Sequence, residues 1–93
     1  MNKKTKNLLI ERMTENLIVF RAKLGITQAE LAELAGISRQ TILAIEKKQR
    51  GMTWNMYLAL MFIFTTNPGT APLVELFEVG DKELENFLTA KKH

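Results

Sequence analysis

The amino-acid sequence predicts an all-α fold with two short helices at a sharp turn near its centre. Apolar residues recur at helical spacing along the chain, and no segment keeps the strict alternation that a strand requires. Residues 27–46, TQAELAELAGISRQTILAIE, contain two short helical patterns separated by a glycine. The 93-residue length fits one domain with a short appendage.

A first helix is expected to begin after Thr14, which can cap it, and to end at Gly25. Between them, apolar residues such as Leu17, Phe20 and Leu24 recur at helical spacing. Residues 1–13 are basic and are expected to form either an extension of this helix or a separate N-terminal arm.

The second helix has clear start and stop signals. Thr27 can cap it, and Glu30, three residues later, completes a capping box. Gly36 stands where a left-handed residue ends a helix at little steric cost. The inward face would consist of Leu31, Ala32 and Ala35, and the small Ala32 permits a close crossing by the next helix.

The third helix is expected to start after Ser38, which can cap it, and to end near Lys47 and Lys48, whose charges suit the helix dipole. Ile42 and Ile45 lie on one stripe that faces inward. Two helices joined in this way form a helix-turn-helix, which lays its second helix into the major groove of DNA.

Thr53 can cap a fourth helix, from Trp54 to about Phe64, which is apolar on nearly every face and should therefore be buried all round. After the break at residues 67–69, a fifth helix is expected over 71–78 and a sixth, capped by Asp81, over 82–90. Either this tail folds back over its own domain or it packs against a second copy. We expect a homodimer, and the interface to this second copy or to another partner would be formed by Leu73, Leu76, Phe77, Leu84, Phe87 and Leu88.

Residues 14–64 resemble the Cro/phage-repressor type of helix-turn-helix family, also called the xenobiotic-response-element family. The matching residues stand at the family's spacing, with Arg21 in the preceding helix: Gln28, Leu31, Ala32, Gly36, Ile37, Ser38, Ile42, Ile45 and Glu46. The resemblance implies a lambda-repressor-like bundle of four to five helices, here with a short C-terminal helical extension. It also implies an ion pair in which Arg21 meets Glu46.

At 100° per residue, the third helix turns Gln40, Leu43 and Ala44 away from the core. The resemblance places Arg39, Gln40 and Ala44 at base-reading positions, and Leu43 is a further base-contact candidate. Arginine can pair with guanine and glutamine with adenine, while Ala or Leu can touch a thymine methyl group.

Phosphate contacts are expected around the same helix. The resemblance matches Gln28 to a phosphate-binding residue at the N-terminus of the second helix, a position that suits an anion. Residues 1–50 hold ten Lys or Arg against five Glu, whereas residues 51–93 hold three Lys against five acids. The basic half therefore suits a phosphate backbone. The further phosphate candidates are Ser38, Thr41, Lys47, Lys48 and Arg50.

Composition argues against several classes of protein. There is no cysteine, and the single histidine is the last residue, so we expect no metal, no cofactor and a cytoplasmic location. The longest apolar run, within residues 56–64, is half of what a membrane span needs. No group of residues resembles a catalytic site, and we expect no enzyme activity.

The sequence therefore predicts a sequence-specific regulator of transcription that binds double-stranded DNA, acting as a repressor at a palindromic operator. Its parts would be residues 1–13 (arm or helix extension), 14–65 (DNA-binding domain) and 66–93 (packing or dimerisation). One alternative is an antitoxin-like module that binds a second protein through residues 70–93. A small-ligand sensor, with a pocket beneath the fourth helix, is a weaker third possibility.

Overall fold

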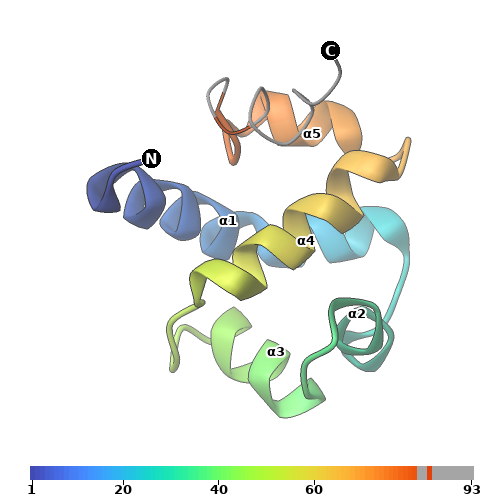
Figure 1. The fold of residues 1–93 in the computed structure, drawn as a ribbon. Helices are drawn as coiled ribbons and strands as arrows, with labels where there is room; N and C mark the ends of the chain where they lie inside the picture. Colours follow the sequence, from blue (N-terminus) through green and yellow to red (C-terminus); the bar gives the residue numbers. More distant parts are fainter. Residues whose placement is uncertain (82–83, 85–93) are drawn as a thin grey trace.

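The computed structural model describes residues 1–81 and Leu84, and it confirms the all-α, lambda-repressor-like bundle. In the view of Figure 1, α2 and α3 lie at the bottom, α5 lies at the top, and α1 and α4 run between them. The five helices of the described residues are α1 (Lys3–Leu24), α2 (Gln28–Ala35), α3 (Arg39–Glu46), α4 (Trp54–Thr66) and α5 (Ala71–Leu76).

The first helix begins at Lys3 and so includes most of residues 1–13, which were expected to form either an extension of this helix or a separate arm. Asn2 caps α1 by accepting a hydrogen bond from the Thr5 backbone N–H, and Gly25 ends it with a φ of 70°. The expectation that Thr14 caps the helix is wrong, because Thr14 lies inside α1 and donates its hydroxyl to the Ile10 carbonyl. The apolar stripe continues through Leu9 and so carries the helix back toward the N-terminus. The expected division after residue 13 thus falls within α1, and the three-part organisation of the chain stays a prediction.

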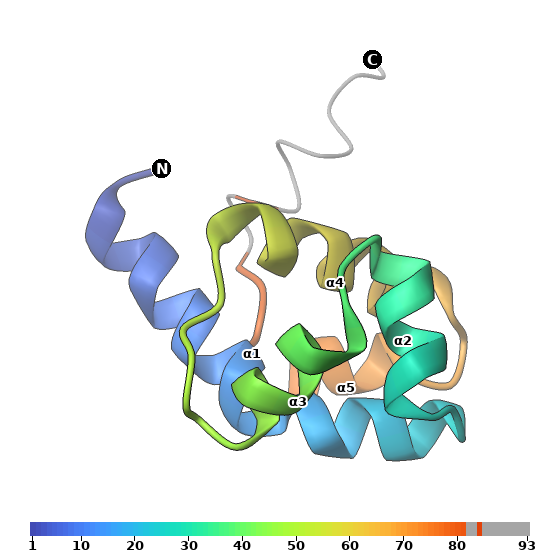
Figure 2. The ribbon, with the colours of Figure 1, turned by 90° about the horizontal axis from the view of Figure 1, so that it is seen from below.

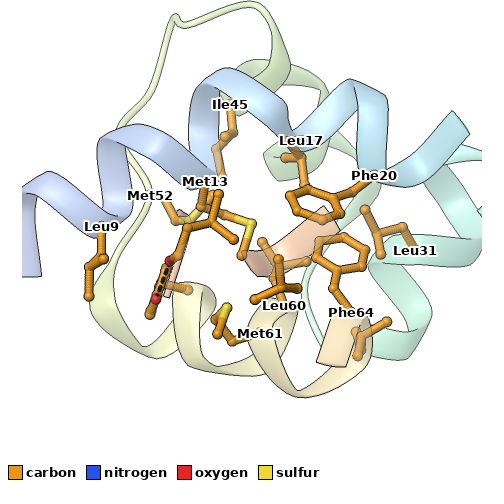
Figure 3. Packing of buried hydrophobic residues seen from close by; sticks show 14 of the residues in the cluster. Leu9, Met13, Leu17, Phe20, Leu31, Ile45, Met52, Leu60, Met61 and Phe64 are labelled. Carbon is orange, nitrogen blue, oxygen red and sulfur yellow. Dashed lines mark hydrogen bonds between the residues drawn. The ribbon is translucent and has the colours of Figure 1, made fainter. Parts of the chain in front are cut away.

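The core lies between α1 and α4, with α2 and α3 closing one end (Figure 3). Phe20 of α1 and Phe64 of α4 stack with their ring centroids 4.5 Å apart, and Leu31 of α2 lies beside them. Ile45 reaches the same cluster from α3. Burial of these side chains fixes the position of the helix-turn-helix against the rest of the chain.

The fourth helix is covered on one side only. Thr53 caps α4 as expected, since its hydroxyl accepts from the Met56 backbone N–H at 3.1 Å. Within its own chain α4 is not buried all round, because the side chain of Phe62 is 70% exposed, and packing of this face against a second copy stays a prediction.

The chain then folds back over the opposite end of the core. α5 ends at Leu76, two residues before the expected end. Thr70, at its start, is buried and donates its hydroxyl to the Phe64 carbonyl at 2.7 Å. Beyond α5 the tail crosses α1 and α4: Arg12 donates to the Glu78 carbonyl, and the Tyr57 hydroxyl donates to the buried Val79.

This fold-back changes the expected interface. Leu84 is only 3% exposed within its own chain, and Leu73 and Phe77 pack against the same core, so these three are not free surface residues. Leu76, by contrast, is 70% exposed. Asp81 accepts from the Leu84 backbone N–H, as a capping residue does. The remaining expectations, a sixth helix over 82–90 with Phe87 and Leu88, lie outside the described residues.

Candidate nucleic-acid interface

Local capping and burial together set the orientation of α3. The capping box of α2 is present in both directions, between Thr27 and Glu30, and Gly36 ends α2 with a φ of 72°. Ser38 then caps α3, its hydroxyl accepting from the Thr41 backbone N–H at 3.1 Å. Ile42 and Ile45 are fully buried beneath the helix. These features present the opposite side of α3 to solvent.

The predicted base-contact residues lie on that outer side. Arg39 and Gln40 are exposed in the first turn of α3, and Leu43 and Ala44 are half-buried farther along. Figure 2, which looks onto α2 and α3, shows α3 lying over the rest of the bundle on this side. The four side chains thus share a face that has a guanidinium, an amide and two apolar groups.

A buried ion pair holds the end of α3 against α1. Arg21 Nε lies 2.7 Å from Glu46 Oε2, and Arg21 Nη2 donates to Glu46 Oε1 at 3.1 Å, so the contact is bidentate. The Glu46 side chain is only 4% exposed. Arg21 also donates to the carbonyl of Ile26, which joins the turn before α2 to the same network.

The ion pair shifts the pKa values of both of its residues. Hydrogen bonding to Glu46 raises the pKa of Arg21, against the opposing effect of burial, and the charge of Glu46 adds to it. Burial by itself would raise the pKa of Glu46, but hydrogen bonds from Arg21 and Gln28 and the charge of Arg21 bring it below its ordinary value. Both groups are therefore ionised at neutral pH.

Gln28 belongs to this network, which the sequence did not reveal. Its Nε2 donates to Glu46 Oε1 at 2.9 Å. The residue predicted to bind a phosphate is thereby held by the carboxylate that also binds Arg21. Gln28 is still partly exposed as the first residue of α2, so its backbone N–H group stands at a helix N-terminus.

The remaining phosphate candidates fall into two groups. Ser38, Lys47, Lys48 and Arg50 are exposed around the two ends of α3. Thr41 is only 9% exposed, and its hydroxyl contacts the Ser38 hydroxyl and accepts from Arg50 Nη1 at 3.2 Å. This burial argues against a direct phosphate contact by Thr41.

The contact between Arg50 and Thr41 was also missed by sequence reasoning. Arg50 follows α3 by four residues, and helical spacing gives no information about where the loop after α3 returns. In the structure, Lys48 takes a positive φ of 60°, and Arg50 turns back to the first turn of α3. The candidate interface thus includes a guanidinium tethered beside the N-terminus of α3.

A shallow cleft of about 480 Å³ lies next to this interface. One side is formed by the first half of α1, including Glu11 and Glu15, and the other by the loop after α3, including Lys48 and Arg50. Its position differs from the pocket beneath the fourth helix that a ligand sensor was expected to need.

Comparison with known proteins agrees with this geometry. A family model described as helix-turn-helix matches residues 18–53. An HTH-type transcriptional regulator of Archaeoglobus fulgidus is 35% identical over 65 residues, which span 70% of this chain and 86% of the relative. Another, of Methanothermobacter thermautotrophicus, is 63% identical over 27 residues, which span 29% of this chain and 39% of the relative. No solved structure matches.

Within residues 1–81, no helix combines the length and the apolar character that crossing a membrane requires. The matched segment covers α2 and α3 entirely, together with the Arg21–Glu46 pair. The chain therefore belongs to the Cro/phage-repressor type of the helix-turn-helix family, a family of DNA-binding transcriptional regulators and not of enzymes.

Proposed function

We propose that this protein is a cytoplasmic repressor that reads a palindromic operator, as a homodimer, through the helix that starts at Ser38. The observation that carries the proposal is the two-sided character of α3. Its isoleucines are fully buried, and Arg39 and Gln40 are exposed on the first turn. A helix held in this way can enter a major groove without any rearrangement of the core.

The exposed chemistry suits base edges. Arg39 can donate two hydrogen bonds to O6 and N7 of a guanine, and Gln40 can pair with N6 and N7 of an adenine. Leu43 and Ala44, which are half-buried, offer apolar contact to a thymine methyl group. We therefore expect an operator half-site that contains at least one G·C pair and one A·T pair within reach of α3.

The surrounding charge suits the phosphate backbone. Lys47, Lys48 and Arg50 are exposed beyond the C-terminus of α3, and Arg50 is held by Thr41 near the N-terminus of the helix. Gln28 stands at the N-terminus of α2, where its backbone N–H can face a phosphate while its side-chain amide is held by Glu46. These contacts would fix the register of the protein on DNA, and the base contacts would supply specificity.

Selection of bound duplexes from a random-sequence pool tests the proposal. The expected result is an enriched inverted repeat whose half-sites are about one helical turn apart, since two recognition helices of a dimer lie about 34 Å apart. Placing the enriched site over a promoter should then lower transcription when the protein is present. Failure to enrich any sequence would contradict the proposal.

One observation favours a second candidate, an antitoxin-like role in which residues 70–93 bind another protein. Leu76 stays 70% exposed at the end of α5, although it is a large apolar side chain. Co-expression with the proteins encoded by neighbouring genes, followed by co-purification, tests this role. The Leu76→Glu variant is the control. A one-to-one complex that the variant loses would support it.

A further inference from the structure

Large apolar side chains are also exposed on α1 (Ile18 and Val19) and α2 (Leu34), but those helices contain charged residues, whereas α4 does not. The sequence of α4, WNMYLALMFIFTT, contains no charged side chain. Tyr57, Leu60, Met61 and Phe64 are buried on one side, and Phe62 projects from the opposite side at 100° per residue. Phe62 is 70% exposed, and its neighbours Leu58 and Ala59 are half-buried. We call Leu58, Ala59 and Phe62 the α4 patch.

The α4 patch lies to the side of the DNA-binding face and not behind it. Figure 2 looks onto α2 and α3, and α4 runs along the upper edge of the molecule in this view. The inward side of α4 faces α1, so the patch points outward from that edge. A two-fold axis placed beside the patch, parallel to the line of sight, would leave both copies of α3 facing the same way. Binding to one side of a DNA duplex requires this arrangement.

The charge pattern favours a second copy of the chain as the occupant. In a two-fold contact residue i of one copy meets residue j of the other, and only residues close to the axis meet their own copies, so a charge near the axis faces a like charge. Much of the remaining surface is unsuitable for a position near a two-fold axis, because residues 1–50 hold ten Lys or Arg against five Glu. An uncharged patch has no such repulsion, and an aromatic side chain at its centre is the usual anchor of an interface.

The geometry points to the α4 patch as the surface through which two copies of this chain associate, with Phe62 of each copy packed near the two-fold axis. This inference rests on the proposed function, which requires a dimer, and it places the contact on α4 and not on the tail. The tail residues Leu73, Phe77 and Leu84 already pack in their own chain.

Sedimentation equilibrium of the full-length chain and three variants tests the inference. Phe62→Glu and Phe62→Lys each place like charges near the axis, and Leu76→Glu is a matched control because Leu76 has the same exposed fraction on α5. We expect the wild type and Leu76→Glu to dimerise alike. Each Phe62 variant should dimerise at least about 100-fold more weakly, because like charges in an interface cost several kcal/mol.

Mixing the two Phe62 variants gives a positive readout. If the side chains meet near the axis, the Glu and Lys variants should associate with each other more tightly than either does with itself. Circular dichroism melting of each variant checks that it is folded, and we expect little change because Phe62 is largely exposed. Dimerisation of both Phe62 variants at the wild-type strength would overturn the inference. So would a wild-type monomer, in which another segment or another protein covers the patch, and so would loss of the dimer in Leu76→Glu alone.

Binding to single half-sites separates this inference from the proposed function. If Phe62 belongs to the dimer interface and does not contact DNA, the Phe62→Glu variant keeps the wild-type preference for a half-site. It loses the extra affinity for the full palindrome. If the wild type shows no sequence preference on any duplex, the proposed function fails, whatever the variants show in the centrifuge. If the variant keeps the full affinity for the palindrome, the inference fails and the proposed function stands.

Discussion

The α2–α3 region and the α4–α5 region bury similar apolar side chains but are held in different ways. The former is positioned by specific polar contacts, above all the bidentate pair of Arg21 with Glu46 and the bond from Gln28 to Glu46. The latter is positioned mainly by apolar packing, such as the stacked rings of Phe20 and Phe64. Polar contacts have strict directional requirements, whereas apolar packing is tolerant of small shifts.

The two regions also differ in what they expose. The outer face of α3 has an arginine and a glutamine, whereas the outer face of α4 has a phenylalanine and no charge. The difference suggests two kinds of contact: a polar, negatively charged surface against α3 and an apolar surface against α4. The polar network thus lies beside the helix that must be held in a fixed position against a ligand.

The largest expected effect comes from removing the ring that joins the two regions. Phe64→Ala should lower the free energy of unfolding by about 3–5 kcal/mol, because it leaves a cavity against Phe20 and beside Leu31. Phe64→Leu, which keeps most of the volume, should cost clearly less. Urea unfolding followed by circular dichroism measures both. Separate transitions for the two regions, or a loss below about 1 kcal/mol, would show that they are not one cooperative unit.

Removing the shared carboxylate should affect the polar region almost as strongly. Glu46→Ala leaves Arg21 without its partner, and we expect a loss of about 3 kcal/mol in the free energy of unfolding. Gln28→Ala removes only one neutral donor to the same carboxylate and should cost about 1 kcal/mol. Chemical denaturation of the two variants side by side gives the comparison. Equal losses would show that the ion pair does not dominate the network.

The same carboxylate gives the polar region a dependence on pH. The pKa of Glu46 in the folded chain is below its ordinary value of about 4.3, because hydrogen bonds and the charge of Arg21 outweigh the effect of burial. Its stabilising contribution is therefore complete above about pH 4.3 and is lost as the pH falls through the folded-state pKa. The difference in unfolding free energy between the wild type and Glu46→Gln should shrink from pH 6 toward about pH 3. A difference that stays constant over this range would contradict the assignment.

A smaller effect is expected at the edge of the proposed DNA-binding face. Lys47→Ala should weaken binding to all duplexes alike and lower the slope of log K against log salt by about 1, because it removes one phosphate contact. Lys23→Ala, an exposed change on α1, serves as the control for net charge. Fluorescence anisotropy at several salt concentrations measures the slope. An unchanged slope for Lys47→Ala, or an equal change for both variants, would place Lys47 outside the interface.

Sequence reasoning succeeded where one residue type performs one local task. The capping box of Thr27 and Glu30, the left-handed Gly36 and the cap at Ser38 all follow from backbone geometry within a few residues. The family resemblance predicted the partner of Arg21, which lies 25 residues away along the chain.

Sequence reasoning failed where the answer depends on what other parts of the chain cover. Thr14 has the chemistry of a cap, but the earlier cap at Asn2 and the continuing apolar stripe extend α1 past it. The composition of α4 predicted that either the tail or a second copy covers its outer side but could not decide between them, and the described tail folds over α1 and the inner side of α4 and leaves Phe62 exposed. The return of Arg50 to Thr41 depends on a loop, for which the sequence has no periodic pattern.

The measurement that tests the central claim most directly is the affinity of Arg39→Ala for the selected operator and for a scrambled duplex of equal length. If the N-terminal part of α3 reads base pairs, the variant should lose about 1–3 kcal/mol at the operator and little at the scrambled duplex. Equal losses on both duplexes, or no loss on either, would contradict the account.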